Sequence, residues 1–225
     1  GVSAPQGELK GDQATFSRGS FYPKVEITNQ SEKDLVINDI SLGNPNAEPK
    51  VTLAADTISL KFDIGSVDPT NELLISIDNQ GAGNVQIAGL VDNPMGRIRV
   101  VNADGGIVSK TGSNGVLRGN VVEVDSDENV GTQQDDLKID LVRSEGRTTD
   151  LDVTAGSDLW IDLTGRLRDT NTSQKQFDVG SIAATGDVNI DVQSALHETT
   201  PTGSGGAISV TENGGTAKKF YAKYD

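Results

Sequence analysis

Apolar and polar residues alternate with a period of two along most of the chain, which is typical of half-buried β-strands. Helical patterns are nearly absent, because the best candidate, VQSALHETT at 192–200, contains a threonine pair and precedes Pro201, which favours a turn. We predict strands near 24–28, 35–42, 50–53, 57–64, 72–78, 84–91, 96–102, 106–109, 116–125, 137–142, 150–154, 158–164, 177–183, 187–193 and 206–211.

Several of these stretches repeat one another at fixed offsets. VEITNQSEKDLVINDI at 25–40 aligns with LISIDNQGAGNVQIAGL at 74–90, which places Ile77 and Asn79 at 50 residues beyond Ile27 and Asn29. IRVVNADGGIVS aligns a further 23 residues on, and the stretches at 151–163 and 182–192 align at an offset of 29. Short strands that recur at such spacings, joined by Asn, Gly and Asp turns, predict a β-solenoid.

The break inside LDVTAGSDLWIDL, at 151–163, is interpreted as a corner between two sides of one coil. Asn29, Asn79 and Asn102 are expected to satisfy backbone groups at these corners. Gly156 and Gly186 are expected to supply a left-handed backbone there. Stacked coils would then bury a continuous aliphatic column, which a single coil cannot do alone.

Two stacked sheets of Ig-like repeats are the alternative fold, and they predict hairpins and antiparallel neighbours. The solenoid is favoured because the same corner pattern returns at different spacings, as insertions at corners would cause. GRLRDTNTSQKQ at 165–176, SVDPTNE at 66–72 and TGSNG at 111–115 are interpreted as such insertions. We predict one domain over 1–225, with irregular ends or caps at 1–20 and 200–225.

Charge and composition narrow the range of partners. The formal net charge is −14, from 33 acidic and 19 basic residues, which argues against nucleic acid and anionic membrane surfaces. The chain has no cysteine, so disulfides and thiolate chemistry are excluded. No stretch is long and apolar enough for a transmembrane helix, so no membrane insertion is predicted. The N-terminal residues lack the pattern of a signal peptide.

The motifs VVNADGGIVS, VTAGSDLWIDL and AATGDVNIDV resemble the repeats of large secreted bacterial exoproteins of the filamentous haemagglutinin type, over about residues 24–195. The resemblance implies a right-handed parallel β-helix. It also implies an extracellular or cell-surface location and a structural or adhesive role beside neighbouring domains of a longer protein. A glycan or the surface of a host or neighbouring cell is the implied partner.

An enzyme is the alternative, because parallel β-helices also include polysaccharide lyases and glycoside hydrolases. Glycoside hydrolysis needs two carboxyl groups at a set separation. Asp135 and Asp136 adjoin in sequence and would face opposite sides of a strand. The polygalacturonase-like pattern requires Gly-His-Gly and Arg-Ile-Lys, whereas His197 is the chain's one histidine and 97–99 reads Arg-Ile-Arg. We therefore predict no catalytic residues and a protein that is not an enzyme.

No cofactor is predicted apart from one weak calcium site. Asp125, Asp127 and Glu128 alternate as calcium-binding carboxylates do, although neither an EF-hand loop nor a calcium-binding nonapeptide is present. A solvated acidic turn is the alternative interpretation of this cluster.

Trp160 is the chain's single tryptophan and a candidate binding residue. In DLWIDL the alternation turns Leu159 and Ile161 inward, so Trp160 should point outward and could stack on a sugar or contact a partner. Coverage by the 165–176 insertion is the other interpretation. Arg166 and Arg168 are candidates for binding an acidic glycan, with ion pairing to nearby acids as the alternative.

Overall fold

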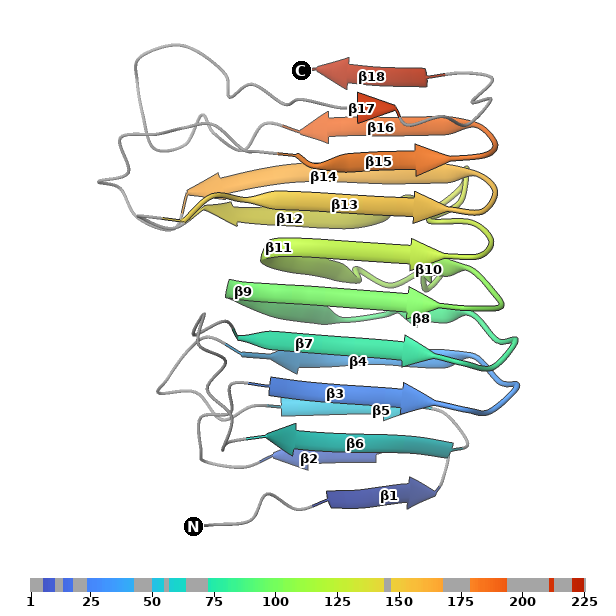
Figure 1. Ribbon diagram of the computed structural model, residues 1–225, viewed down its shortest axis with the longest axis vertical. Helices are drawn as coiled ribbons and strands as arrows, with labels where there is room; N and C mark the ends of the chain where they lie inside the picture. Colours follow the sequence, from blue (N-terminus) through green and yellow to red (C-terminus); the bar gives the residue numbers. More distant parts are fainter. Residues whose placement is uncertain are drawn as a thin grey trace.

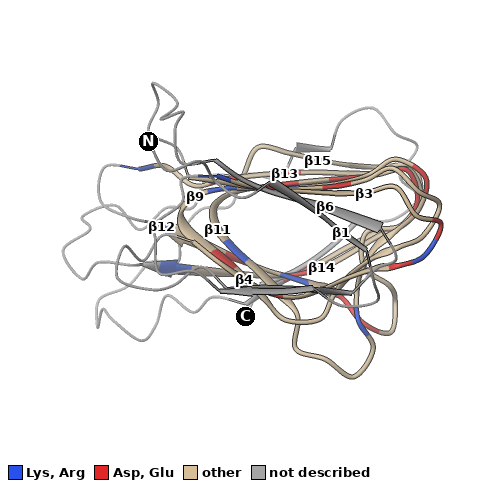
Figure 2. Cartoon of the chain, turned by 90° about the horizontal axis from the view of Figure 1, so that it is seen from below, with Lys and Arg blue, Asp and Glu red and all other residues tan. Residues whose placement is uncertain are grey.

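The chain folds into a right-handed parallel β-solenoid, as predicted. The computed structural model describes residues 24–42, 73–143, 147–167 and 179–193 and the short strands at 6–10, 14–17, 50–54, 57–63, 211–212 and 220–224. In Figure 1 the parallel coils run left to right along the near sheet, return right to left along the far sheet, and climb from one pass to the next. Figure 2 shows these two sheets enclosing the core, viewed along the stack.

The near sheet is a stack of parallel strands in continuous register. Ile27 pairs with Ile77, Ile77 with Val100, Val100 with Val124, and Val124 with Val153. The predicted offsets of 50 and 23 residues are therefore confirmed. The strands are β3 (Lys24–Asn29), β7 (Leu74–Asn79), the second half of β9 (Leu90–Asn102), the second half of β11 (Val116–Ser126), β13 (Asp150–Ala155), β15 (Ser181–Ala184) and β17 (Thr211–Glu212).

The far sheet is stacked in the same way, and its register confirms the offset of 29 residues, since Leu159 pairs with Val188. Strands β9 and β11 bend from the far sheet into the near one, and β11 has a register shift between Gly119 and Val121. The strands are β4 (Leu35–Ser41), β8 (Val85–Ile87), the first half of β9, β10 (Ile107–Ser109), the first half of β11, β12 (Leu137–Arg143), β14 (Leu159–Leu167), β16 (Val188–Gln193) and β18 (Phe220–Tyr224).

At the N-terminal end of the stack the pairing is antiparallel, which the solenoid prediction did not include. Strands β5 (Lys50–Ala54) and β6 (Thr57–Asp63) pair antiparallel with β4 and β3. Strands β1 (Gln6–Lys10) and β2 (Ala14–Ser17) then pair antiparallel with β6 and β5. At the other end, β18 pairs parallel with β16. It stays a prediction that the two ends act as caps and that the chain forms one domain over 1–225.

Aliphatic columns running along the stack form the core. In the near sheet the column that begins at Ile27 and ends at Ile182 is at most 2% exposed at every level. Facing it in the far sheet is the column that begins at Leu35 and ends at Val188. Each fully buried aliphatic side chain contributes roughly 1.5–3 kcal/mol, so the stacked coils stabilise one another through these columns.

A buried asparagine ladder joins the first coils at the corner after the near sheet. Asn29 donates from Nδ2 to Asn79 Oδ1 over 2.6 Å, and Asn79 donates to Asn102 Oδ1 over 2.9 Å. Asn102 Nδ2 donates to the carbonyl of Gly106 over 2.8 Å. The predicted role of these asparagines at the corners is confirmed.

The predicted reason for the corner glycines is wrong. Positive φ occurs, among the described glycines, at Gly112 and Gly131 and not at Gly156 or Gly186. A Cβ on Gly156 would lie 1.9 Å from the carbonyl oxygen of Asp127 in the coil before it. Close approach of neighbouring coils, rather than left-handed backbone, therefore requires glycine at this corner.

The TGSNG insertion lies where it was predicted, as the turn between β10 and β11. The 66–72 insertion and most of 165–176 lie outside the described residues, although β14 itself extends to Leu167. Among the described residues, no helix has the length and apolar character needed to cross a membrane.

Candidate functional site

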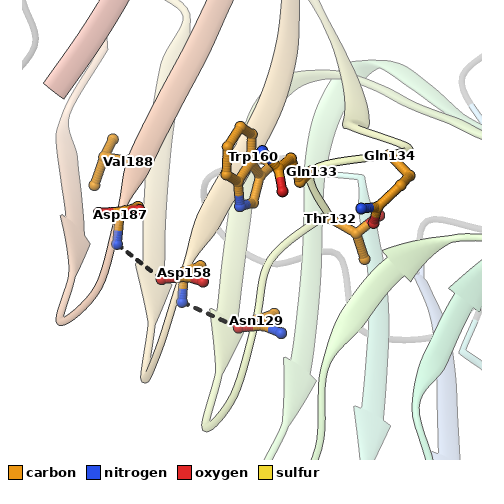
Figure 3. A pocket seen from close by; sticks show the side chains of 8 residues that line it. All are labelled: Asn129, Thr132, Gln133, Gln134, Asp158, Trp160, Asp187 and Val188. Carbon is orange, nitrogen blue, oxygen red and sulfur yellow. Dashed lines mark hydrogen bonds between the residues drawn. The ribbon is translucent and has the colours of Figure 1, made fainter. Parts of the chain in front are cut away.

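A groove of about 520 Å³ opens on the outside of the stack around Trp160 (Figure 3). It is built from three successive levels of the solenoid: the segment between β11 and β12, the start of β14, and the start of β16. The side chains that line it are mostly polar: Asn129, Thr132, Gln133, Gln134, Asp158, Trp160, Asp187 and Val188.

One wall of the groove is a ladder of side chains that links consecutive coils (Figure 3). The backbone N–H of Asp158 donates to Asn129 Oδ1 over 3.1 Å, and that of Asp187 donates to Asp158 Oδ1 over 2.8 Å. Each bond spans 29 residues of sequence but only one level of the stack. The ladder therefore holds the Asp158 carboxylate and the Asn129 amide in fixed positions at the groove, with the backbone of Asp187 beside them.

Trp160 points outward from β14, as predicted. Its neighbours Leu159 and Ile161 are fully buried, whereas Trp160 is partly exposed and pairs in register with Asn189. Gly131, at φ 68°, brings the preceding coil so close that a Cβ there would lie 1.9 Å from the Trp160 carbonyl oxygen. The backbone of Trp160 is thus packed closely against the preceding coil, while its outward indole is partly exposed.

The surface beside the groove is acidic, and two of its carboxyl groups are perturbed. Burial raises the pKa of Asp162, with a further increase from Asp191 and a partial offset from Lys138. Burial also raises the pKa of Asp136, and the nearby carboxylates Asp191 and Asp162 add to that increase. Lys138, Asp162 and Asp191 pair in register across β12, β14 and β16, and Asp162 lies on the same outer face as Trp160.

The candidate Arg166 does not join this groove but forms an ion pair with Asp140. The Asp140 carboxylate is 3% exposed, and its Oδ2 lies 2.5 Å from Arg166 Nε and 2.9 Å from Arg118 Nε. The ion pair that was the alternative interpretation of Arg166 is therefore present, and glycan binding by Arg166, whose side chain is 52% exposed, stays a prediction. Arg168 lies outside the described residues.

The calcium candidates are on the other sheet and the turn after it. Asp125 is exposed on β11, and Asp127 and Glu128 are exposed in the following turn. Within the described ranges, no three acidic or histidine side chains are grouped as metal ligands. The weak calcium site stays a prediction. Heat on calorimetric titration with calcium, removed by Asp127→Asn, would support it.

Sequence reasoning missed most of the groove. Gln133 and Gln134 precede β12 in a turn whose position depends on the coil after it, so no local pattern marks them. The carboxylates did carry a signal, because Asp158 and Asp187 share the 29-residue offset of the surrounding apolar positions. The ladder could have been predicted from this pattern: a polar position repeats at the coil offset, immediately before an inward-facing residue.

No protein-family model, curated protein or solved structure matches this chain. The fold is therefore known from the structure itself, and function must be argued from the chemistry of the surface.

Proposed function

We propose that this chain is a non-catalytic structural or adhesive segment of a large secreted or cell-surface bacterial protein, similar to those of the filamentous haemagglutinin type. The observation that carries the proposal is the parallel pairing that continues through both sheets from β3 and β4 to β16, which supports a stiff body with side chains presented at repeating positions. Neighbouring domains of the same protein and a glycan or cell surface are the proposed partners.

Stiffness follows from the way neighbouring coils are joined. Both sheets continue their backbone hydrogen bonds from coil to coil, and the inner asparagine ladder and the outer carboxylate ladder add side-chain bonds at the corners. Because a coil buries its apolar face only against its neighbours, opening one coil exposes part of the next. The segment should therefore resist bending and local opening.

Limited proteolysis with trypsin tests this part of the proposal. Its potential cleavage sites within the described strands include Arg97, Arg99, Arg118 and Lys138. We expect these bonds to stay intact under conditions that digest the heat-unfolded chain within minutes. Rapid cleavage at these sites in the folded protein would contradict a stiff structural role.

Adhesion is tested with beads that carry the folded chain, applied to cell monolayers and to immobilised polysaccharides. Beads that carry the heat-unfolded chain provide the matched control. Retention of the folded-chain beads above this control supports a contact role, and equal retention argues against it.

A polysaccharide-degrading enzyme is the second candidate, favoured by the raised pKa of Asp162 and Asp136 beside the groove. A carboxyl group with a raised pKa is what a general acid for glycoside hydrolysis requires. Release of reducing sugar from a polysaccharide, abolished by Asp162→Asn, would favour this alternative over the structural role. Absence of release across a broad panel would leave the structural role as the better account.

A further inference from the structure

The groove around Trp160 offers a ligand a combination of groups suited to sugars. Its lining contains one indole, three amides, one hydroxyl and two carboxylates, and neither lysine nor arginine is among these residues. Its volume of about 520 Å³ lies within the ordinary range of ligand pockets. We infer that the groove binds an uncharged pyranose glycan, an inference that rests on the contact role proposed above and specifies the ligand.

Trp160 supplies the surface on which a sugar ring stacks. The indole is partly exposed and stands over the groove (Figure 3). A pyranose ring presents C–H groups on one face and hydroxyl groups around its rim. Aromatic side chains bury such apolar faces while their surroundings stay hydrated, which suits a ligand of mixed polarity.

The polar groups around the indole match a ligand that both donates and accepts hydrogen bonds. The amides of Asn129, Gln133 and Gln134 donate and accept, as sugar hydroxyls do. A simple cation would use the carboxylates of Asp158 and Asp187 but none of the amide N–H groups. An anionic glycan would be repelled by these two carboxylates. The uncharged sugar uses every kind of group present.

The groove follows the axis of the solenoid across three levels, from Gln134 through Trp160 to Asp187. Two spacings between neighbouring strands are about 10 Å, a length suited to linked sugar rings rather than a single one. The outer ladder fixes the Asn129 amide oxygen and the Asp158 carboxylate before any ligand arrives, because each accepts from a backbone N–H of the next coil. Such preorganisation lowers the entropy cost of binding.

Fluorescence titration is the direct test, because Trp160 is the single tryptophan of the chain. The probes are cellotetraose, maltotetraose, mannotetraose and chitotetraose as uncharged chains, the deacetylated chitosan tetramer as a cation, and oligogalacturonate as an anion. We expect a saturable change in emission with at least one uncharged chain and none with oligogalacturonate. Binding of the cation alone, binding of the anion, or no response to any uncharged chain would each overturn the inference.

Point variants test whether the glycan binds in the groove. Gln133 and Gln134 are exposed, so Gln133→Ala and Gln134→Ala should fold normally and keep the tryptophan signal. Each should weaken glycan binding about five-fold, the effect of one net hydrogen bond. Gln30→Ala, at an exposed glutamine in the turn between β3 and β4, is the matched control and should bind like the unaltered chain. Equal affinity in all three variants would place the glycan elsewhere and refute the groove.

A negative result for the groove can be told apart from a negative result for the adhesive role. Beads that adhere equally well with and without Gln133→Ala would keep the proposed function and remove the groove as its site. Glycan binding that Gln133→Ala weakens, by a chain whose beads do not adhere, would keep the groove and remove the adhesive role.

Discussion

Replacing Asn79 with alanine removes the central member of the buried asparagine ladder. The Asn79 amide nitrogen lies 2.7 Å from the carbonyl oxygen of Gly83, 2.9 Å from that of Gly81 and 2.9 Å from Asn102 Oδ1. Its Oδ1 accepts from Asn29 over 2.6 Å. The side chain thus joins three levels of the stack and is fully buried.

The expected loss in the free energy of unfolding depends on which groups lose a hydrogen-bond partner. Gly83 O keeps a bond from Asn102 Nδ2, and Asn29 Nδ2 keeps the Lys33 carbonyl as an acceptor. Asn102 Oδ1 and Gly81 O lose the Asn79 amide. Two buried groups left unsatisfied at about 1–3 kcal/mol each predict a loss of about 2–6 kcal/mol in the free energy of unfolding.

Urea unfolding followed by far-ultraviolet circular dichroism measures this loss. Gln80→Ala is the matched control, because Gln80 adjoins Asn79 in sequence and is exposed, so its loss should stay within about 0.5 kcal/mol. If Asn79→Ala costs no more than Gln80→Ala, the ladder does not stabilise the stack and the reasoning is refuted.

Two further predictions concern a corner and the acidic surface. Gly156→Ala should lower the free energy of unfolding by about 1–3 kcal/mol, because its Cβ would meet the Asp127 carbonyl oxygen. Gly112→Asn, at an open turn where φ is 75°, should cost less in the same urea assay, and equal costs would contradict the close-approach argument. The folded-state pKa of Asp162 is raised above 3.8 mainly by burial, so its contribution to stability falls as the pH rises above 3.8 and the carboxyl ionises. Asp162→Asn should therefore raise the urea midpoint at neutral pH but not at about pH 3, and a gain of equal size at both would show that ionisation is not the cause.

Sequence pattern predicted the register because inward apolar positions repeat at the coil offset. Ile27 and Ile77, or Leu159 and Val188, recur at the spacing that the backbone pairing later shows. The pattern did not predict strand direction at the N-terminal end. Period two is the same for parallel and antiparallel strands, so β5 and β6 were expected as strands without their antiparallel pairing.

The surface was harder to predict, because exposure depends on what lies beside a residue. Asp140 alternates outward, between the inward Ile139 and Leu141, which would suggest an exposed acid. It is buried because Arg118 from the coil before and Arg166 from the coil after both bond to its Oδ2. Those partners are 22 residues before it and 26 after it, and neither spacing is among the offsets that the repeats revealed.

Two ladders of side-chain hydrogen bonds join the corners after the near sheet, and they run over different lengths of the stack. The inner ladder of asparagines ends at Asn102; Ser126 continues it by donating to the Gly105 carbonyl over 2.9 Å, and Ala155 follows in register without any polar group. The outer ladder is present at both the early and the later corners. In the early coils the Asn84 N–H donates to Asp34 Oδ1 and the Gly106 N–H donates to Asn84 Oδ1, each over 2.8 Å, and in the later coils the ladder runs through Asn129, Asp158 and Asp187.

The later corners lack the buried amide but keep the outer ladder, and there its acceptors are the Asn129 amide oxygen and the Asp158 carboxylate. Holding the coils from outside places acidic side chains beside the outward face of β14, where Trp160 stands. The chemistry that joins the later coils therefore also supplies the polar wall of the groove. For this reason Asp158→Ala should disturb both the stack and the groove, whereas Gln133→Ala should disturb the groove alone.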